Sequence, residues 1–229
     1  MTIAGLEASL RQVLQIQAHP SGAVAVLMAI VGVAAALIPG IWHVTRPITA
    51  MAHEGAHAAV GSAVGRKITG IELKFNGDGG TSHTGPDDSS VIRFPITFIG
   101  YLGPSALGVG AAALIHAGYI VAVLWIGLAG LLAILVLAYK SVGVVLVIAA
   151  LAVLGLLLDR APVHVQVLTA YALAWFLLVS SVRLVAEHGK GAVDAGTLHS
   201  LTGIAPSFWP IPWLLGSLAA LVYGATLLL

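Results

Sequence analysis

The stretch Thr49–Gly65, TAMAHEGAHAAVGSAVG, carries two histidines and a glutamate in the order HExxH. On a helix, His53 and His57 lie on one face, so both imidazoles can reach a single metal ion. Glu54 stands beside the first histidine and is placed to accept a proton from a metal-bound water. The flanking residues are mostly Ala, Gly, Val and Met, which is typical of a helix packed inside a membrane. The motif therefore predicts a metal site in an apolar setting.

The composition of the whole chain agrees with that setting. Of the 229 residues, 59% are hydrophobic and only 8% are charged, and the mean hydropathy is +1.03. Soluble domains carry about 25% charged residues, so the composition indicates a polytopic membrane protein in contact with the lipid bilayer. The net charge of +1 is uninformative about nucleic acid, and the lack of a basic cluster predicts no nucleic-acid partner. With no cysteine present, any metal ligand must come from His, Asp or Glu.

Apolar segments divide the chain into about seven membrane-crossing candidates. They cover about 22–42, 47–64, 94–116, 119–138, 142–158, 163–185 and 213–229. Residues 1–21 have an amphipathic pattern without a cleavage site, which predicts an interfacial segment and no signal peptide. The predicted fold is an all-α polytopic membrane protein with about six to seven transmembrane helices, in a single domain over residues 1–229.

Three local signals predict how these segments begin, break and connect. The polar loop 66–93 holds an alternating stretch, Lys67–Phe75, followed by a turn signal at Asn76–Gly80, so we expect a short β-hairpin. The stretch Gly100–Pro104 predicts a break inside the third apolar segment. Pro47 is expected in the first turn of the helix that carries the motif. Trp209 and Trp213 are expected in an interfacial aromatic belt.

The distribution of Lys and Arg predicts an orientation. With seven crossings and the N-terminus inside, the inner loops hold eight of these residues and the outer loops hold two. By the positive-inside rule, the N-terminus is cytoplasmic and the C-terminus lies outside. This prediction depends on the motif-bearing segment being a true crossing.

Two histidines do not complete a catalytic zinc site, which usually has three protein ligands and an open position. The hairpin acids are also explained as turn formers, and Asp159 as a partner of Arg160. Asp194 suits either a ligand or the N-cap of a short helix over residues 194–205. Local reasoning leaves the third ligand open. The candidates are Asp78, His83, Asp87, Asp88, Asp159, Glu187, His188, Asp194 and His199.

Four stretches resemble the site-2 protease family of intramembrane zinc metallopeptidases, in its compact bacterial branch without extra domains. They are HEGAH at 53–57, GRKITGIELKFNGDGGTSHTG at 65–85, GYLGPSALG at 100–108 and DAGTLHSLTGI at 194–204. The resemblance implies a Zn²⁺ ion held by His53, His57 and Asp194, with Glu54 as the catalytic base. The aspartate is followed by Ala195, where many members of that family have glycine.

By this resemblance the protein is expected to cleave membrane-embedded or juxtamembrane segments of membrane protein substrates, in a bacterial cell membrane. The strand-like Ile68–Phe75 offers a place for an unwound substrate to add as a further strand. A re-entrant helix at 194–204 would bring Asp194 to the histidines. Two alternatives use the same residues without proteolysis: a transporter or metal-handling protein, and an inactive relative that acts as a binding protein. Substrate identity and oligomeric state have no signal in the sequence.

Overall fold

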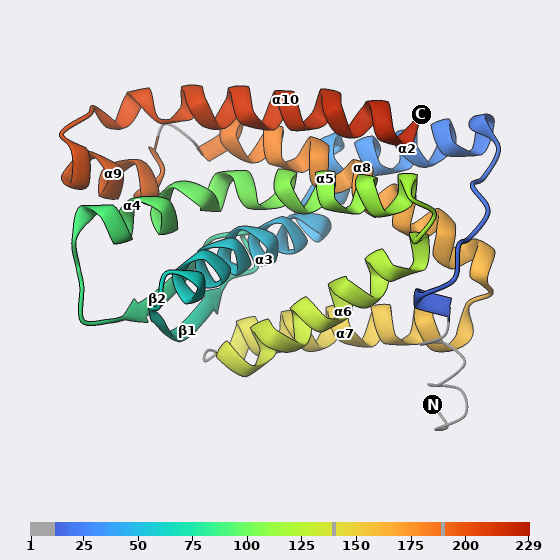
Figure 1. The fold of residues 1–229 in the computed structure, drawn as a ribbon, viewed down its shortest axis with the longest axis horizontal. Helices are drawn as coiled ribbons and strands as arrows, with labels where there is room; N and C mark the ends of the chain where they lie inside the picture. The colour runs from blue at the N-terminus through green and yellow to red at the C-terminus, as the bar shows by residue number, and fades with distance from the viewer. Residues whose placement is uncertain (1–11, 139–140, 189–190) are drawn as a thin grey trace.

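The computed structural model describes residues 12–138, 141–188 and 191–229, and it is mostly helical (Figure 1). In chain order the elements are α2 (Gly22–Leu37), α3 (Pro39–Ala63), β1 (Lys67–Leu73), β2 (Gly79–Thr84), α4 (Ser90–Ile99), the 3-10 turn η1 (Gly100–Leu102), α5 (Gly103–His116), α6 (Ile120–Leu137), α7 (Ser141–Arg160), α8 (Val163–His188), α9 (Val193–Thr202), the 3-10 turn η3 (Pro206–Phe208) and α10 (Pro210–Leu228). Most of the predicted interfacial segment lies outside the described residues.

The predicted fold class is confirmed. Within the described residues, five helical segments are long and apolar enough to cross a membrane, and the bent pair α2–α3 makes six if it counts as one span. The stretch 47–64 is the second part of α3 and makes no separate span, so the described residues hold at most six of the seven expected crossings. A count of five leaves the two termini on opposite sides and a count of six leaves them on the same side. The orientation therefore stays a prediction.

The first two helices meet at a bend of 91° between Leu37 and Pro39. Ile38 has extended backbone angles (φ −74°, ψ 119°), because a residue before proline is disfavoured in the helical region. Pro39 then fits the first turn of α3. The prediction that Pro47 begins a helix is wrong, since Pro47 lies inside α3.

The bend exposes carbonyls at the end of α2, and distant side chains bind them. Thr45 Oγ1 donates a hydrogen bond to the Ala35 carbonyl at 2.8 Å, and Arg183 Nη1 donates to the Ala36 carbonyl at 2.7 Å. The Arg183 guanidinium also lies 4.5 Å from the ring centroid of Trp42. Helix ends leave carbonyls without an intrahelical partner, so these contacts stabilise the bend.

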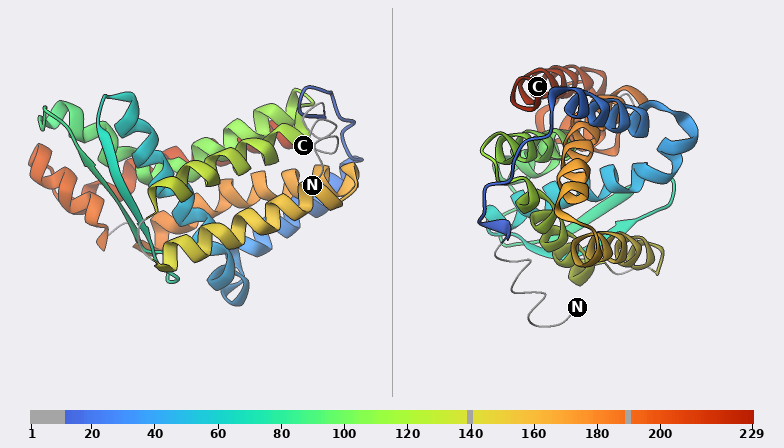
Figure 2. Two further views of the ribbon diagram at one scale, coloured as in Figure 1. Left: turned by 90° about the horizontal axis from the view of Figure 1, so that it is seen from below. Right: turned by 90° about the vertical axis from the view of Figure 1, so that its right-hand side faces the viewer.

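Helices α2, α5, α8 and α10 run along the long axis and form the main bundle (Figure 1). Their fully buried side chains include Ile115 of α5 and Leu178 of α8, and α6 adds Leu124 to the same cluster. The hairpin, α4 and α9 gather at one end of this bundle, and the C-terminus lies at the other (Figures 1 and 2).

The predicted break at Gly100–Pro104 is confirmed as the turn η1 between α4 and α5. Neighbouring helices bind two carbonyls at the break: Trp213 Nε1 donates to the Phe98 carbonyl at 2.9 Å, and Ser181 Oγ donates to the Tyr101 carbonyl at 3.1 Å. This is the condition under which broken helices are tolerated in membranes. Trp213 is fully buried and stacks on Tyr101, and Trp209 is also buried, so the predicted interfacial belt is wrong for both.

The predicted hairpin is confirmed, with β1 and β2 antiparallel and Ile71 opposite Thr81. Ile71 and Leu73 are buried against α6 and α7. The outer edge of β1 forms a bridge from Ile71 to Ala138, at the end of α6. The hairpin is therefore fixed to the bundle through β1, and β2 has β1 as its one strand partner among the described residues.

Candidate metal centre

His53, His57 and Asp194 converge from two helices onto one point. Their closest atoms form a near-equilateral triangle: His53 Nε2 to His57 Nε2 is 3.1 Å, and Asp194 Oδ2 lies 3.3 Å and 3.4 Å from the two nitrogens. The three residues make up a group that could hold a metal ion. Helix α3 supplies the histidines from one face, as their spacing predicts, and α9 supplies the aspartate from 137 positions further along the chain.

The triangle fits a tetrahedral zinc ion. Ligands about 2.0–2.1 Å from such an ion lie about 3.3–3.4 Å from one another, which matches the observed distances closely. Asp194 Oδ2 and His53 Nδ1 are also buried polar atoms without a hydrogen-bond partner in the described part of the chain. Buried atoms of this kind need an explanation, and for Asp194 Oδ2 a bound cation supplies one.

The two histidines differ in how their second ring nitrogen is held. His57 Nδ1 donates to the Ile96 carbonyl at 2.6 Å, which leaves the lone pair on Nε2, toward the triangle. His53 lacks such a partner among the described residues and is instead held by ring contacts. Its ring packs edge-on against Tyr101, with centroids 4.9 Å apart. His57 is therefore the better oriented of the two.

Asp194 lies in the first turn of α9, and the alternative that it is a plain N-cap is wrong. The N-cap residue is Ala192, and no side chain caps this end of the helix. Burial raises the pKa of the Asp194 carboxyl, but the adjacent imidazoles of His53 and His57 lower it by more. The net pKa lies below the usual range, which favours the ionised form of the carboxyl.

Two glycines of the broken helix allow it to approach the histidines. A Cβ on Gly100 would lie 2.5 Å from His57 Cε1 and 2.7 Å from His53 Cε1. A Cβ on Gly103 would lie 2.6 Å from the Ala56 Cβ. The small residues of GYLGP and of the motif helix therefore allow these two segments to pack closely at the site.

The side chain of Glu54 contacts the hairpin. The side chain is buried, and its Oε2 accepts a hydrogen bond from Thr81 Oγ1 at 2.8 Å. Gly79 leaves room for it, because a Cβ there would lie 2.7 Å from Glu54 Oε1. The carboxylate thus sits between the motif helix and β2.

The sequence was compared with models of known protein families. A model of the peptidase M50B-like family matches residues 24–224, which is most of the chain and includes all four residues described above.

The chain belongs to the peptidase M50B-like family.

This finding confirms the resemblance to site-2 proteases, and membership implies a membrane metallopeptidase. No curated protein and no solved structure matches the chain.

The remaining ligand candidates of this M50B-like protein lie outside the triangle. Asp159 pairs with Arg160 at 2.7 Å, as expected from the sequence. Glu187 pairs with Arg183 at 2.6 Å. His83 accepts a hydrogen bond from Arg66, and burial followed by the charge of Arg66 lowers its pKa. The others have local partners or lie outside what the structure describes. Asp78, Asp87, Asp88 and His199 bond within their own loops or to Arg66, and the side chain of His188 lies outside the described set.

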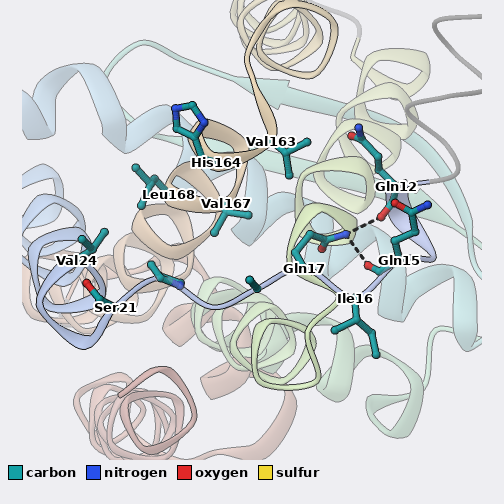
Figure 3. Close-up of a pocket in the computed structure, with 12 residues that line it drawn as sticks. Gln12, Gln15, Ile16, Gln17, Ser21, Val24, Val163, His164, Val167 and Leu168 are labelled. Atoms are coloured by element: carbon teal, nitrogen blue, oxygen red, sulfur yellow. Dashed lines mark hydrogen bonds between the residues drawn. The ribbon is translucent and has the colours of Figure 1, made fainter.

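A cavity of about 580 Å³ lies at the far end of the M50B-like fold, between the segment that precedes α2 and the start of α8 (Figure 3). Gln12, Gln15 and Gln17 line one side, and the Gln17 amide donates to the Gln12 carbonyl at 2.7 Å. Among the described residues of its lining, His164 is the one titratable residue, and it does not reach the metal centre.

Sequence reasoning missed Thr81, Gly79 and Gly100 as parts of the site. The turn signal at Asn76–Gly80 includes Gly79, but in the structure Gly79 begins β2. Thr81 follows that turn at a position where alternation places its side chain on the same face as Gly79. That alternation was the available signal.

Proposed function

We propose that the protein is an intramembrane zinc metalloprotease that hydrolyses peptide bonds of membrane-embedded or juxtamembrane segments. The observation that supports it most is the convergence of His53, His57 and Asp194 within 3.1–3.4 Å of one another, beside the buried Glu54. A zinc ion held by these three groups would supply an acidified water and a Lewis acid for the scissile carbonyl.

The chain's own residues divide the remaining work. Glu54 accepts the proton of the attacking water and returns it to the leaving amine. The Ile96 carbonyl keeps the His57 imidazole in the tautomer that presents Nε2. Asp194 supplies the negative charge that two neutral imidazoles lack.

The substrate segment would bind as an added strand, because a helical backbone hides its carbonyls. The sequence predicts this role for β1, but Ile71 on its outer edge is already bridged to Ala138. The free edge among the described strands belongs to β2, the strand that contacts Glu54. We therefore assign substrate pairing to β2.

Glu54→Gln tests the function. The purified protein, reconstituted with zinc, is incubated with a panel of single-span peptides with and without a Gly-Pro helix break, and products are identified by mass spectrometry. Wild type should cleave peptides with the break, and Glu54→Gln should bind zinc equally while turnover falls by about 100- to 10,000-fold. Asp159→Asn, far from the triangle, serves as the matched control.

Normal cleavage by Glu54→Gln would contradict the mechanism. Zinc flux into liposomes without cleavage would favour a transporter, and bound zinc with neither activity would favour a binding protein.

A further inference from the structure

One face of β2 is turned toward α3, and its residues fall into two contacts. Gly79 and Thr81 lie against Glu54, while His83 lies against Arg66, whose Nε donates to it at 3.2 Å. These positions are two residues apart, as the alternation of a strand requires. The inward face of β2 is thus built around two charged side chains of the motif helix and its end.

The contact with Glu54 is close on both sides of the carboxylate. Thr81 Oγ1 lies 2.8 Å from Glu54 Oε2 and 3.0 Å from the Glu54 carbonyl oxygen. Gly79 leaves the opposite oxygen free of a clash, since a Cβ there would be 2.7 Å from Oε1 and 2.8 Å from Cγ. Among the described residues, Thr81 is the one side chain that donates a hydrogen bond to this buried carboxylate. A buried carboxylate without a donor is strongly destabilised.

Thr81 is itself held in place by the strand opposite. Ile71 faces it in the register, is fully buried, and packs in a cluster with Ile134 of α6 and Val147 of α7. At the other end of the hairpin, Arg66 Nη2 pairs with Asp88 at 2.6 Å. The hydroxyl is therefore carried by a strand that is fixed to the bundle.

We infer that Thr81 is a positioning residue for Glu54. It holds the carboxylate in one direction through its hydroxyl, and Gly79 provides the space in which the carboxylate lies. The inference rests on the proposed function for the role of Glu54. Because β2 also carries the free edge, the strand assigned to the substrate is the strand that orients the base.

Thr81→Val and Thr81→Ser separate the hydroxyl from the volume of the side chain. With a single-span peptide that wild type cleaves, Thr81→Val should lower kcat by about 10- to 100-fold, the value of one hydrogen bond to a charged group, with little change in KM. Thr81→Ser keeps the hydroxyl and should restore most of the turnover. Thr226→Val, the same change on an exposed turn of α10, is the control. Equal turnover in Thr81→Val and Thr81→Ser would overturn the inference.

A second measurement needs neither zinc nor cleavage. Thermal midpoints are measured for the metal-free protein with Thr81→Val, Glu54→Ala and both changes together. If the two side chains are bonded, Thr81→Val lowers the midpoint in wild type but much less beside Glu54→Ala, because residues in contact are not additive. Additive shifts would overturn the contact. Non-additive shifts in a protein that cleaves no peptide would leave the contact intact and count against the proposed function instead.

Discussion

The metal-centre end of the molecule and the α6–α7 pair are built on opposite principles. Glu54, His57 and Arg66 are buried polar residues in or next to α3, whereas none of the buried polar side chains of the described chain lies on α6 or α7. Only 17% of the apolar stretch of α7 is buried inside the protein, so most of this helix is at least partly exposed on the protein surface. At the metal centre, each buried polar side chain is held by specific contacts with other residues. On α7, most side chains need only to be apolar.

The aspartates of the two regions give the strongest test of this difference. Asp194→Ala removes one of the three proposed ligand groups, so zinc affinity should fall by more than about 100-fold, the loss expected when a supporting partner alone is removed. The affinity is measured by titration of the metal-free protein against a competing chelator. Asp159→Ala, which removes an aspartate paired with Arg160, should leave zinc affinity unchanged.

A small loss in Asp194→Ala would show that another carboxylate completes the site. Among the acids described, Glu54 is the nearest by sequence to the histidines, so the double variant with Glu54→Ala would identify it.

Glycine substitutions compare the same change in both regions. Gly100→Ala places a methyl 2.5 Å from His57 Cε1 and 2.7 Å from His53 Cε1, so the imidazoles must move and zinc affinity should fall by about 10- to 100-fold. Gly130→Ala on α6 meets nothing within 4 Å, and should raise the thermal midpoint slightly because alanine is the better helix former. Zinc titration and thermal unfolding in detergent measure the two effects. Equal behaviour of the two variants would mean that the close approach at Gly100 is not required.

Ser181→Ala tests the polar contacts that hold the broken helix. Ser181 Oγ donates to the Tyr101 carbonyl at 3.1 Å and lies 3.1 Å and 3.0 Å from Ser105 Oγ and Ser217 Oγ, all in the protein interior. Its loss leaves buried acceptors without a donor and should cost about 1–3 kcal/mol. The readout is the thermal midpoint in detergent. Ser200→Ala, at an exposed position of α9, should have little effect, and a similar drop there would contradict the argument.

The features that the sequence predicted well have their own local signals. The motif spacing predicted two histidines on one face, the turn signal after Phe75 predicted the hairpin, and Gly100–Pro104 predicted the break. Asp194 could be singled out only through the family resemblance, because its local surroundings suit an N-cap equally well. The structure brings it to the histidines, and its role as ligand stays a proposal.

The features that were missed depend on residues far apart in the chain. The bend lies at Pro39 and not at Pro47, and one contact that stabilises it comes from Arg183, which binds the Ala36 carbonyl from 147 positions away. The contact of Thr81 with Glu54 likewise exists only once the hairpin folds back on α3. Local patterns carry no information about such pairings, since they arise from packing.

The smallest effect on stability and zinc affinity is expected for a substitution on the exposed side of α7. Val153 is 70% exposed, so Val153→Leu exchanges one apolar side chain for another without a packed neighbour to disturb. The thermal midpoint and zinc affinity should both stay at wild-type values, within about 0.5 kcal/mol. A clear drop in stability would show that this face packs against another protein surface, because lipid does not distinguish valine from leucine by shape. The contrast with the metal centre would then no longer hold, since α7 too would have a partner that defines its side chains.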